Sequence, residues 1–125
     1  MTENDISYIV RGCIIDIYKD VGPGLLESAY EAILGYELLQ KGLDVQFQVS
    51  LPLVYKGIRL EAGYRLDLLV NNKVIIEIKS VEALGEIHHK QLITYLRLSG
   101  KKLGILVNFK TADILTSIFR KVNGL

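Results

Sequence analysis

The chain has 125 residues, half of them hydrophobic and 23% charged, and its 15 basic and 14 acidic residues give a formal net charge of +1. This length allows one compact core and excludes two ordinary domains, so we expect a single domain over residues 1–125. The near-neutral charge excludes a global basic field, so a nucleic-acid partner would have to bind a local patch.

Cysteine content and hydrophobic runs narrow the class further. The single cysteine, Cys13, excludes an internal disulfide framework, and the apolar runs are shorter than the roughly 20 residues that cross a bilayer. The opening MTENDISYIVRG lacks the basic start and apolar stretch of a signal peptide. We therefore expect a soluble cytoplasmic protein that makes no contact with a membrane.

Two helices are predicted at the start of the chain. Thr2 and Asp5 resemble a capping box, and apolar residues then recur every three or four positions until about Gly22. Cys13 lies on this apolar stripe, where a buried small hydrophobe is expected rather than a nucleophile. The run LLESAYEAILGYELLQK, residues 25–41, is rich in helix formers and stops at Gly42.

Residues 45–80 change to the two-residue period of strands. VQFQVSL alternates apolar and polar residues, LVYKGIRL has a Lys-Gly turn at its centre, and GYRLDLLV and KVIIEIKS flank Asn71 and Asn72. This pattern predicts an antiparallel meander.

The last third returns to a helix and then a buried strand. GEIHHKQLITYLRLS, residues 85–99, has an apolar stripe and closes at Gly100, and KLGILVNF follows as a short apolar strand. The tail ILTSIFRKV is ambiguous between strand and helix. Because a helix connects the strand ending near Ser80 to the strand in KLGILVNF, we predict an α/β sandwich with a mixed sheet.

Three charged residues interrupt the apolar strands. Glu77 and Lys79 share one strand face and Ile76 lies on the other, because side chains alternate along a strand. A three-residue loop over 71–73 would place Asp67 opposite Glu77, whereas a two-residue loop would place it opposite Ile76. Two facing carboxylates repel each other unless a cation lies between them, so the first register predicts a divalent-metal site.

Hard carboxylate oxygens suit Mg²⁺ or Mn²⁺, which keep water and recruit phosphate oxygens. Lys79 could then orient or help deprotonate an attacking water, or neutralise charge on phosphorus. The simpler interpretation is an ordinary Glu and Lys on a solvated strand edge.

Two helices carry further candidates. His88, Gln91 and Tyr95 form a polar column that could hold a phosphodiester backbone, or could be an exposed polar face. In the second helix Glu27 lies in the first turn, with Tyr30 three residues later. Glu27 could be a metal ligand or could simply complement the helix dipole.

These motifs together resemble a known family. Gly24 to Tyr30 matches the signature of the GxxExxY proteins, while Asp67, Glu77-Ile78-Lys79 and the QLITY segment from Gln91 resemble the PD-(D/E)xK nuclease superfamily in its RecB-like branch. The likeness runs in order from about Gly24 to Phe109. Leu66 replaces the Pro of the superfamily's name, at a position known to vary.

The resemblance implies a restriction-endonuclease-like α/β/α core with a mixed central β-sheet flanked by helices. It implies that Glu27, Asp67 and Glu77 are metal ligands together with the carbonyl of Ile78, and that Lys79 is the catalytic lysine. We therefore predict a Mg²⁺-dependent DNA nuclease in which metal-activated water attacks phosphorus, with Mn²⁺ able to substitute and exonuclease-like action favoured over endonuclease-like action. The predicted contacts to nucleic acid are Tyr30, Arg65, His88, Gln91 and Tyr95.

Other interpretations stay open at this point. Basic residues lie mostly in the second half and could bind phosphates or only balance the acids; they are Arg59, Arg65, Lys79, Lys90, Arg97, Lys101, Lys102, Lys110, Arg120 and Lys121. The chain could be a non-catalytic nucleic-acid-binding or assembly module, or a defence-system nuclease that acts on RNA. A homodimer or a protein partner could supply further binding surface.

Overall fold

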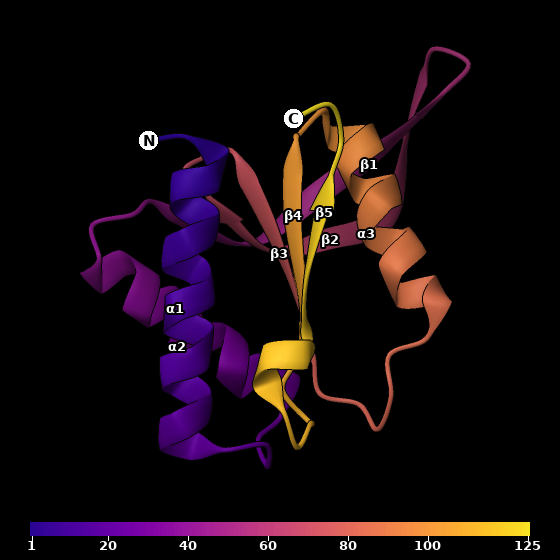
Figure 1. The fold of residues 1–125 in the computed structure, drawn as a ribbon. Coiled ribbons are helices and arrows are strands. Elements are labelled where there is room, and N and C mark those ends of the chain that lie inside the picture. The colour runs from indigo at the N-terminus through magenta and orange to yellow at the C-terminus, as the bar shows by residue number, and fades with distance from the viewer.

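The computed structural model describes residues 1–125, apart from the side chain of Ala62. These residues form three α-helices, a 3₁₀ turn and five strands around one central sheet (Figure 1). In chain order the elements are α1 (Glu3–Val21), α2 (Glu27–Gln40), β1 (Val45–Tyr55), β2 (Ile58–Val70), β3 (Val74–Lys79), α3 (Glu86–Ser99), β4 (Leu103–Asn108), the turn η1 (Ile114–Thr116) and β5 (Ile118–Val122).

The sheet is mixed, as the sequence predicted. Its strands follow the order β1-β2-β3-β4-β5, and β3 and β4 are parallel while the other neighbouring pairs are antiparallel. A parallel pair needs a crossover connection, and α3 supplies it. The architecture is the restriction-endonuclease-like α/β fold that the family resemblance implied.

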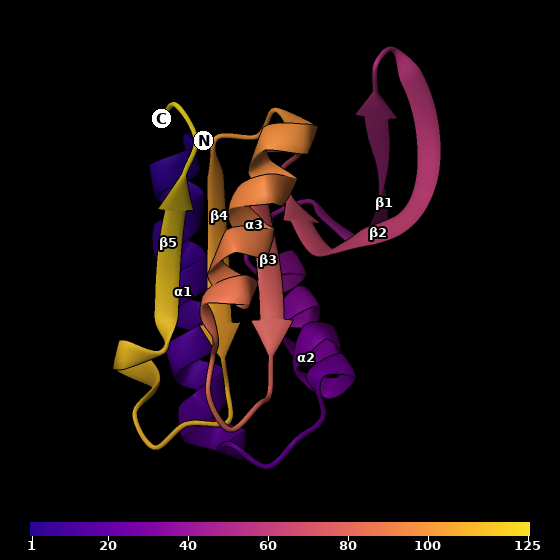
Figure 2. The same cartoon turned by 90° about the vertical axis from the view of Figure 1, so that its right-hand side faces the viewer.

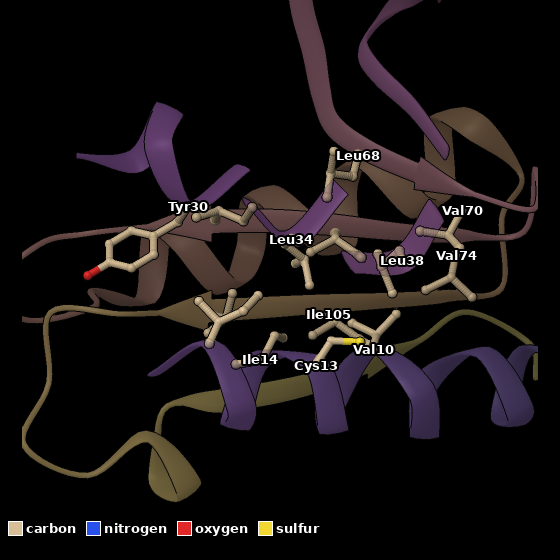
Figure 3. Packing of buried hydrophobic residues seen from close by; sticks show 14 of the residues in the cluster. Val10, Cys13, Ile14, Tyr30, Leu34, Leu38, Leu68, Val70, Val74 and Ile105 are labelled. Atoms are coloured by element: carbon tan, nitrogen blue, oxygen red, sulfur yellow. The ribbon is translucent and has the colours of Figure 1, made fainter. Parts of the chain in front are cut away.

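Helices cover both faces of the sheet (Figure 1). The Thr2–Asp5 capping box is present, and α1 and α2 pack their apolar residues against one face of β2, β3 and β4. Figure 3 shows this core, with Cys13 and Ile14 of α1 beside Ile105 of β4. Buried residues of α3, among them Leu92, pack against the other face.

Small corrections concern the ends of the elements. The second helix begins at Glu27 rather than Leu25 and ends at Gln40. The ambiguous tail contains both a helical turn, η1, and a strand, β5, which pairs with β4. Within the described residues, none of the helices is both long and apolar enough to cross a membrane.

The turn between β2 and β3 decides the register of the charged residues. Val70 pairs with Val74, so the loop is Asn71 to Lys73, the three-residue alternative. Asn71 and Asn72 have φ of 50° and 53°, the left-handed conformation that asparagine adopts more readily than most residues. The ladder is therefore in the register that directs Asp67 toward Glu77.

The hairpin of β1 and β2 extends far beyond the rest of the sheet (Figure 2). It closes at Lys56 and Gly57, with φ of 49° and 78°, so the predicted Lys-Gly turn is confirmed. The pairing shifts between Leu51 and Leu53, a bulge below which the strands join the body of the protein.

Candidate active site

The site begins where β2 separates from β3. Their ladder is regular from Val70 to Leu68, which pairs with Ile76. At the next position the carboxylate of Asp67 replaces the missing backbone partner, because its Oδ2 accepts a hydrogen bond of 2.8 Å from the N–H of Ile78. The Asp67 N–H in turn donates to Oε1 of Glu77 at 3.3 Å. The two predicted carboxylates therefore lie side by side.

A distortion of β1 leaves room for this arrangement. Phe47 pairs with Leu68 and Val49 with Leu66, but the intervening Gln48 has φ of 52° and makes no regular pair with Asp67. The Gln48 side chain donates two hydrogen bonds, of 2.8 and 2.9 Å, to the carboxylate of Glu31 in α2. The β1–β2 ladder is thus interrupted opposite Asp67, whose carboxylate binds the backbone of β3.

The electrostatics show the cost of this pairing. Glu77 is only 5% exposed, and burial, together with the nearby charge of Asp67, raises its pKa to about 9. Burial also raises the pKa of Asp67, while the Ile78 N–H and the charge of Lys79 oppose that rise. Lys79 also acts to lower the pKa of Glu77. The pair therefore needs positive charge to hold both carboxylates ionised.

The backbone of Ile78 offers a further oxygen. The N–H of Phe109 donates to the carbonyl of Lys79 at 2.9 Å, so the Lys79 carbonyl faces β4. Successive carbonyls of a strand point to opposite edges. The Ile78 carbonyl therefore points to the β2 side, toward the edge where Asp67 lies.

Glu27 lies at the rim of this site. It is the first residue of α2, and its Oε2 accepts a 3.0 Å hydrogen bond from the N–H of Ser80, directly after β3. Its charge contributes to the raised pKa of Asp67. Among the described residues, however, no three His, Cys, Asp or Glu side chains are arranged to hold a metal ion. Glu27 would have to leave Ser80 to join the other two carboxylates.

Tyr95 of α3 lies close to the carboxylates. Tyr95 is 6% exposed, and its pKa is raised first by burial and then by the charge of Glu77. Its ring lies 5.9 Å from that of Tyr64 in β2. Tyr64, Gln91 and Tyr95 line a depression of about 210 Å³ between α3 and the hairpin. Gln91 and Tyr95 therefore share one depression, and their contact with nucleic acid stays a prediction.

The predicted contact of Tyr30 with nucleic acid is wrong, whereas that of His88 stays a prediction. Tyr30 is fully buried, stacked on Phe109 with ring centroids 4.1 Å apart, so it belongs to the core. Its hydroxyl accepts from the N–H of Leu25 at 3.1 Å and donates to the Gly22 carbonyl, which fixes the segment before Glu27. His88 uses Nδ1 to accept from the N–H of Gly85 at 3.0 Å, which caps its own helix.

Sequence reasoning missed Glu31 and Asn108. Glu31 lies one helical turn after Glu27, and its pKa is raised by burial and by the charge of Asp67. The side chain of Asn108, 5% exposed, both accepts from the N–H and donates to the carbonyl of Val81, at 3.0 and 2.9 Å. The signals were a Glu four residues after Glu27 and a polar residue ending an apolar strand.

The fold and this geometry define an α/β protein with a carboxylate pair and a lysine at the end of its central strands. The chain belongs to the PD-(D/E)XK nuclease superfamily, whose family model matches residues 4–121. Nucleases of this superfamily act on nucleic acids and generally use divalent metals. A search of curated proteins found no match, and a search of solved structures found none.

Proposed function

We propose that the protein is a metal-dependent DNA nuclease that hydrolyses phosphodiester bonds, with Mg²⁺ as its cofactor and Mn²⁺ able to substitute. The observation that carries this proposal is the placement of Asp67 beside Glu77, with Lys79 on the same face of β3. Exonuclease-like action, placement in the RecB-like branch and membership of the GxxExxY proteins belong to the same proposal. So does the view that residues 1–125 act as one nuclease domain.

The donor set fits a hard divalent cation. Two carboxylates and the backbone carbonyl of Ile78 supply oxygen ligands, and Mg²⁺ is usually held by one or two carboxylates while it keeps several waters. The raised pKa of Glu77 supports this fit, because a nearby cation favours the ionised carboxylate. Glu27 is a third candidate ligand if it turns from Ser80.

Each residue has a separate task in this proposal. When bound, Mg²⁺ would lower the pKa of water and offset negative charge on the phosphorus oxygens. Lys79, on the same strand face as Glu77, would orient the attacking water or neutralise charge near the scissile phosphate. Gln91 and Tyr95 would position the substrate from α3, and Arg65, which is exposed on β2, would contact a phosphate.

Experiment can distinguish two other functions from the proposed DNA nuclease. A non-catalytic binding or assembly module, in which the site has lost its activity, would bind nucleic acid without cutting it. A nuclease directed at RNA would cut RNA in preference to DNA, because discrimination depends on the 2′-hydroxyl. A homodimer or a protein partner remains part of the proposal as a source of additional binding surface.

The test is cleavage of labelled linear, circular and single-stranded DNA, and of matched RNA, with Mg²⁺, Mn²⁺ or EDTA. We expect metal-dependent cutting of DNA that Lys79→Ala slows by about 100-fold or more, the usual range for a group that assists proton transfer or charge stabilisation. Lys19→Ala, an exposed lysine of α1, is the matched control and should keep full activity. Cutting of linear but not circular DNA would identify an exonuclease.

Two results would contradict the proposal. Equal activity of Lys79→Ala and the control would exclude the assigned lysine, and metal-dependent cutting restricted to RNA would exclude DNA as the substrate. A folded protein that binds Mg²⁺ and DNA but cuts none of the substrates would favour the binding module.

A further inference from the structure

The outer part of the β1–β2 hairpin, residues 53–60, is called the arm here. It projects from the body of the protein beside α3 (Figure 2). Several large side chains on it are open to solvent, with exposed fractions of 60% for Val54, 59% for Tyr55 and 62% for Ile58. A two-stranded hairpin is at best marginally stable alone in water, so an arm of this kind gains from contact with a ligand.

The register divides the arm into two faces. Tyr55 pairs with Ile58, and Leu53 with Leu60, so these four side chains share one apolar face that carries an aromatic ring. Val54 pairs with Arg59 on the opposite face. At the tip, Lys56 Nζ lies 5.4 Å from the ring centroid of Tyr55, so a cation and an aromatic surface already lie together.

The arm continues directly into the candidate active site. Below the bulge, β2 carries Tyr64 and Arg65, and two residues later Asp67. Tyr64 lines the same depression as Gln91 and Tyr95. A polynucleotide strand leaving the carboxylates would therefore pass this depression and then the arm.

Charge also favours a polyanion. Residues 53–65 hold three basic residues, Lys56, Arg59 and Arg65, and one acidic residue, Glu61, a net charge of +2 on a chain whose total is +1. Glu61 pairs with Arg59 at 3.3 Å, but both side chains are about 70% exposed. Such an exposed pair is weak, so a phosphate can compete for Arg59.

We propose that the arm binds the nucleic-acid substrate on one side of the cleaved bond, with Tyr55 stacking on a base, Lys56 contacting a phosphate at the tip, and the long side chain of Arg59 reaching a phosphate around the edge of the arm. This inference rests on the proposed nuclease function and adds the substrate path. Stacking on an aromatic side chain combined with cationic contacts is the usual mode of sequence-independent binding to single strands. Such binding is sensitive to salt.

The alternative occupant, a second copy of the chain, fits less well. Tyr55, Ile58 and Leu60 each expose about half of their surface and together offer on the order of 300 Å². A stable interface buries roughly 800 Å² on each partner. The apolar face of the arm is thus too small to hold a dimer by itself.

The length of the arm sets a measurable reach. Ile58 lies nine residues from Asp67, and a strand rises about 3.3 Å per residue, so the arm extends up to about 30 Å from the carboxylates. A stacked DNA strand rises about 3.4 Å per nucleotide, so this distance spans about nine nucleotides. Substrates shorter than this beyond the cut should gain nothing from the arm.

The test compares two triple variants by fluorescence anisotropy with labelled 8- and 30-nucleotide DNA in EDTA, where cleavage is prevented. The arm variant is Tyr55→Ala/Lys56→Asn/Arg59→Gln, and the control is Tyr36→Ala/Lys19→Gln/Arg11→Gln. Tyr36 and Tyr55 are each 59% exposed, and the control residues lie on α1 and α2. Circular dichroism melting checks that both variants are folded.

For the arm variant we expect about 10- to 100-fold weaker binding of the 30-nucleotide DNA and little change for the 8-nucleotide DNA. The slope of log binding constant against log salt concentration should also become shallower, by the amount expected for the loss of about two phosphate contacts. The control should match the wild type. Equal affinity of all three proteins, or equal weakening in both variants, would overturn the proposal. Sedimentation that shows a wild-type dimer dissociated only by the arm changes would also overturn it, in favour of a second copy.

Cleavage of short and long DNA by the same proteins distinguishes failure of the nuclease proposal from failure of the arm proposal. If the wild type binds DNA through the arm but never cuts, the nuclease proposal fails and the arm proposal stands. If the wild type cuts DNA while the arm variant binds and cuts long DNA equally well, only the arm proposal fails.

Discussion

The two faces of β3 use neighbouring residues for opposite purposes. On one face, Val74, Ile76 and Ile78 pack into the apolar core against α1 and α2. On the other, Ile75 packs beneath α3, but Glu77, which pairs with Leu106, places a carboxylate beside Asp67 at nearly the same degree of burial. The strand is equally regular on both faces, so backbone geometry does not distinguish core from site.

The difference lies in what burial does to each side chain. Removing an isoleucine from water stabilises the fold, whereas removing an ionised glutamate beside an aspartate destabilises it. Glu77 therefore has no place in a sheet designed only for stability, and its raised pKa is the physical sign of this cost. Substitutions on the two faces should have opposite effects on stability.

The largest expected effect is on the apolar face. Ile76→Ala should lower the free energy of unfolding by about 2–5 kcal/mol, because a fully buried side chain is removed and a cavity remains. Ile58→Ala, at the 62% exposed tip of the arm, is the matched control and should change it by less than about 0.5 kcal/mol. Urea denaturation measures both. Similar losses at the two positions would show that β3 is not the centre of the core.

The opposite effect is expected at Glu77. In EDTA at pH 8, Glu77→Gln should raise the free energy of unfolding by about 1–3 kcal/mol, since a neutral amide removes the cost of keeping this buried carboxyl protonated at that pH and keeps an oxygen for the Asp67 N–H. Glu86→Gln, an exposed residue of α3, is the control. A destabilised Glu77→Gln in EDTA would show that the carboxylate stabilises the fold.

The direction in which stability changes with pH follows from the raised pKa of Glu77. Below pH 4.5 the Glu77 carboxyl is protonated in both the folded and the unfolded chain. Between its ordinary pKa near 4.5 and the folded value of about 9, the folded chain retains the proton and the unfolded chain does not, so wild-type stability falls as pH rises. Glu77→Gln should lose this contribution to the slope, measured by melting at pH 5, 7 and 9.

A divalent metal should reverse the order of stability of the wild type and Glu77→Gln. If Asp67 and Glu77 hold one ion, Mg²⁺ or Mn²⁺ raises the melting temperature of the wild type by mass action, and Glu77→Gln abolishes that rise. The same rise in both proteins would exclude Glu77 as a ligand. Glu27→Gln, compared in the same way, shows whether the third predicted carboxylate joins the ion.

Much of this comparison could be predicted from the sequence, because strand alternation and turn chemistry act locally. The asparagines at 71 and 72 favour the left-handed loop that sets the register of Asp67, and alternation then separates Glu77 from Ile76. The tail from Ile114 was ambiguous because its strand forms only by pairing with β4, a contact between residues distant from the local pattern.

Parts of the site could not be predicted for the same reason. Gln48 adopts a left-handed φ and donates to Glu31 where the β1–β2 ladder is interrupted opposite Asp67, and no local signal in the sequence predicts that interruption. Tyr30 was assigned to nucleic acid because it follows Glu27 in a motif. Motif membership did not reveal that its side chain points into the core. Removing the buried hydroxyl of Tyr30 is the change for which we expect the smallest effect on stability.

Tyr30 links the apolar face to the site, and Tyr30→Phe tests that link. The change keeps the ring stacked on Phe109 but removes the hydroxyl that binds Gly22 and Leu25, so we expect a loss of about 1 kcal/mol in the free energy of unfolding. Because the Leu25 N–H loses its acceptor, hydrogen exchange at this amide, two residues before Glu27, should quicken. Tyr36→Phe, 59% exposed, should alter neither quantity. Unchanged exchange at Leu25 would mean that the start of α2, and with it Glu27, is positioned by the contacts of Ser80 alone.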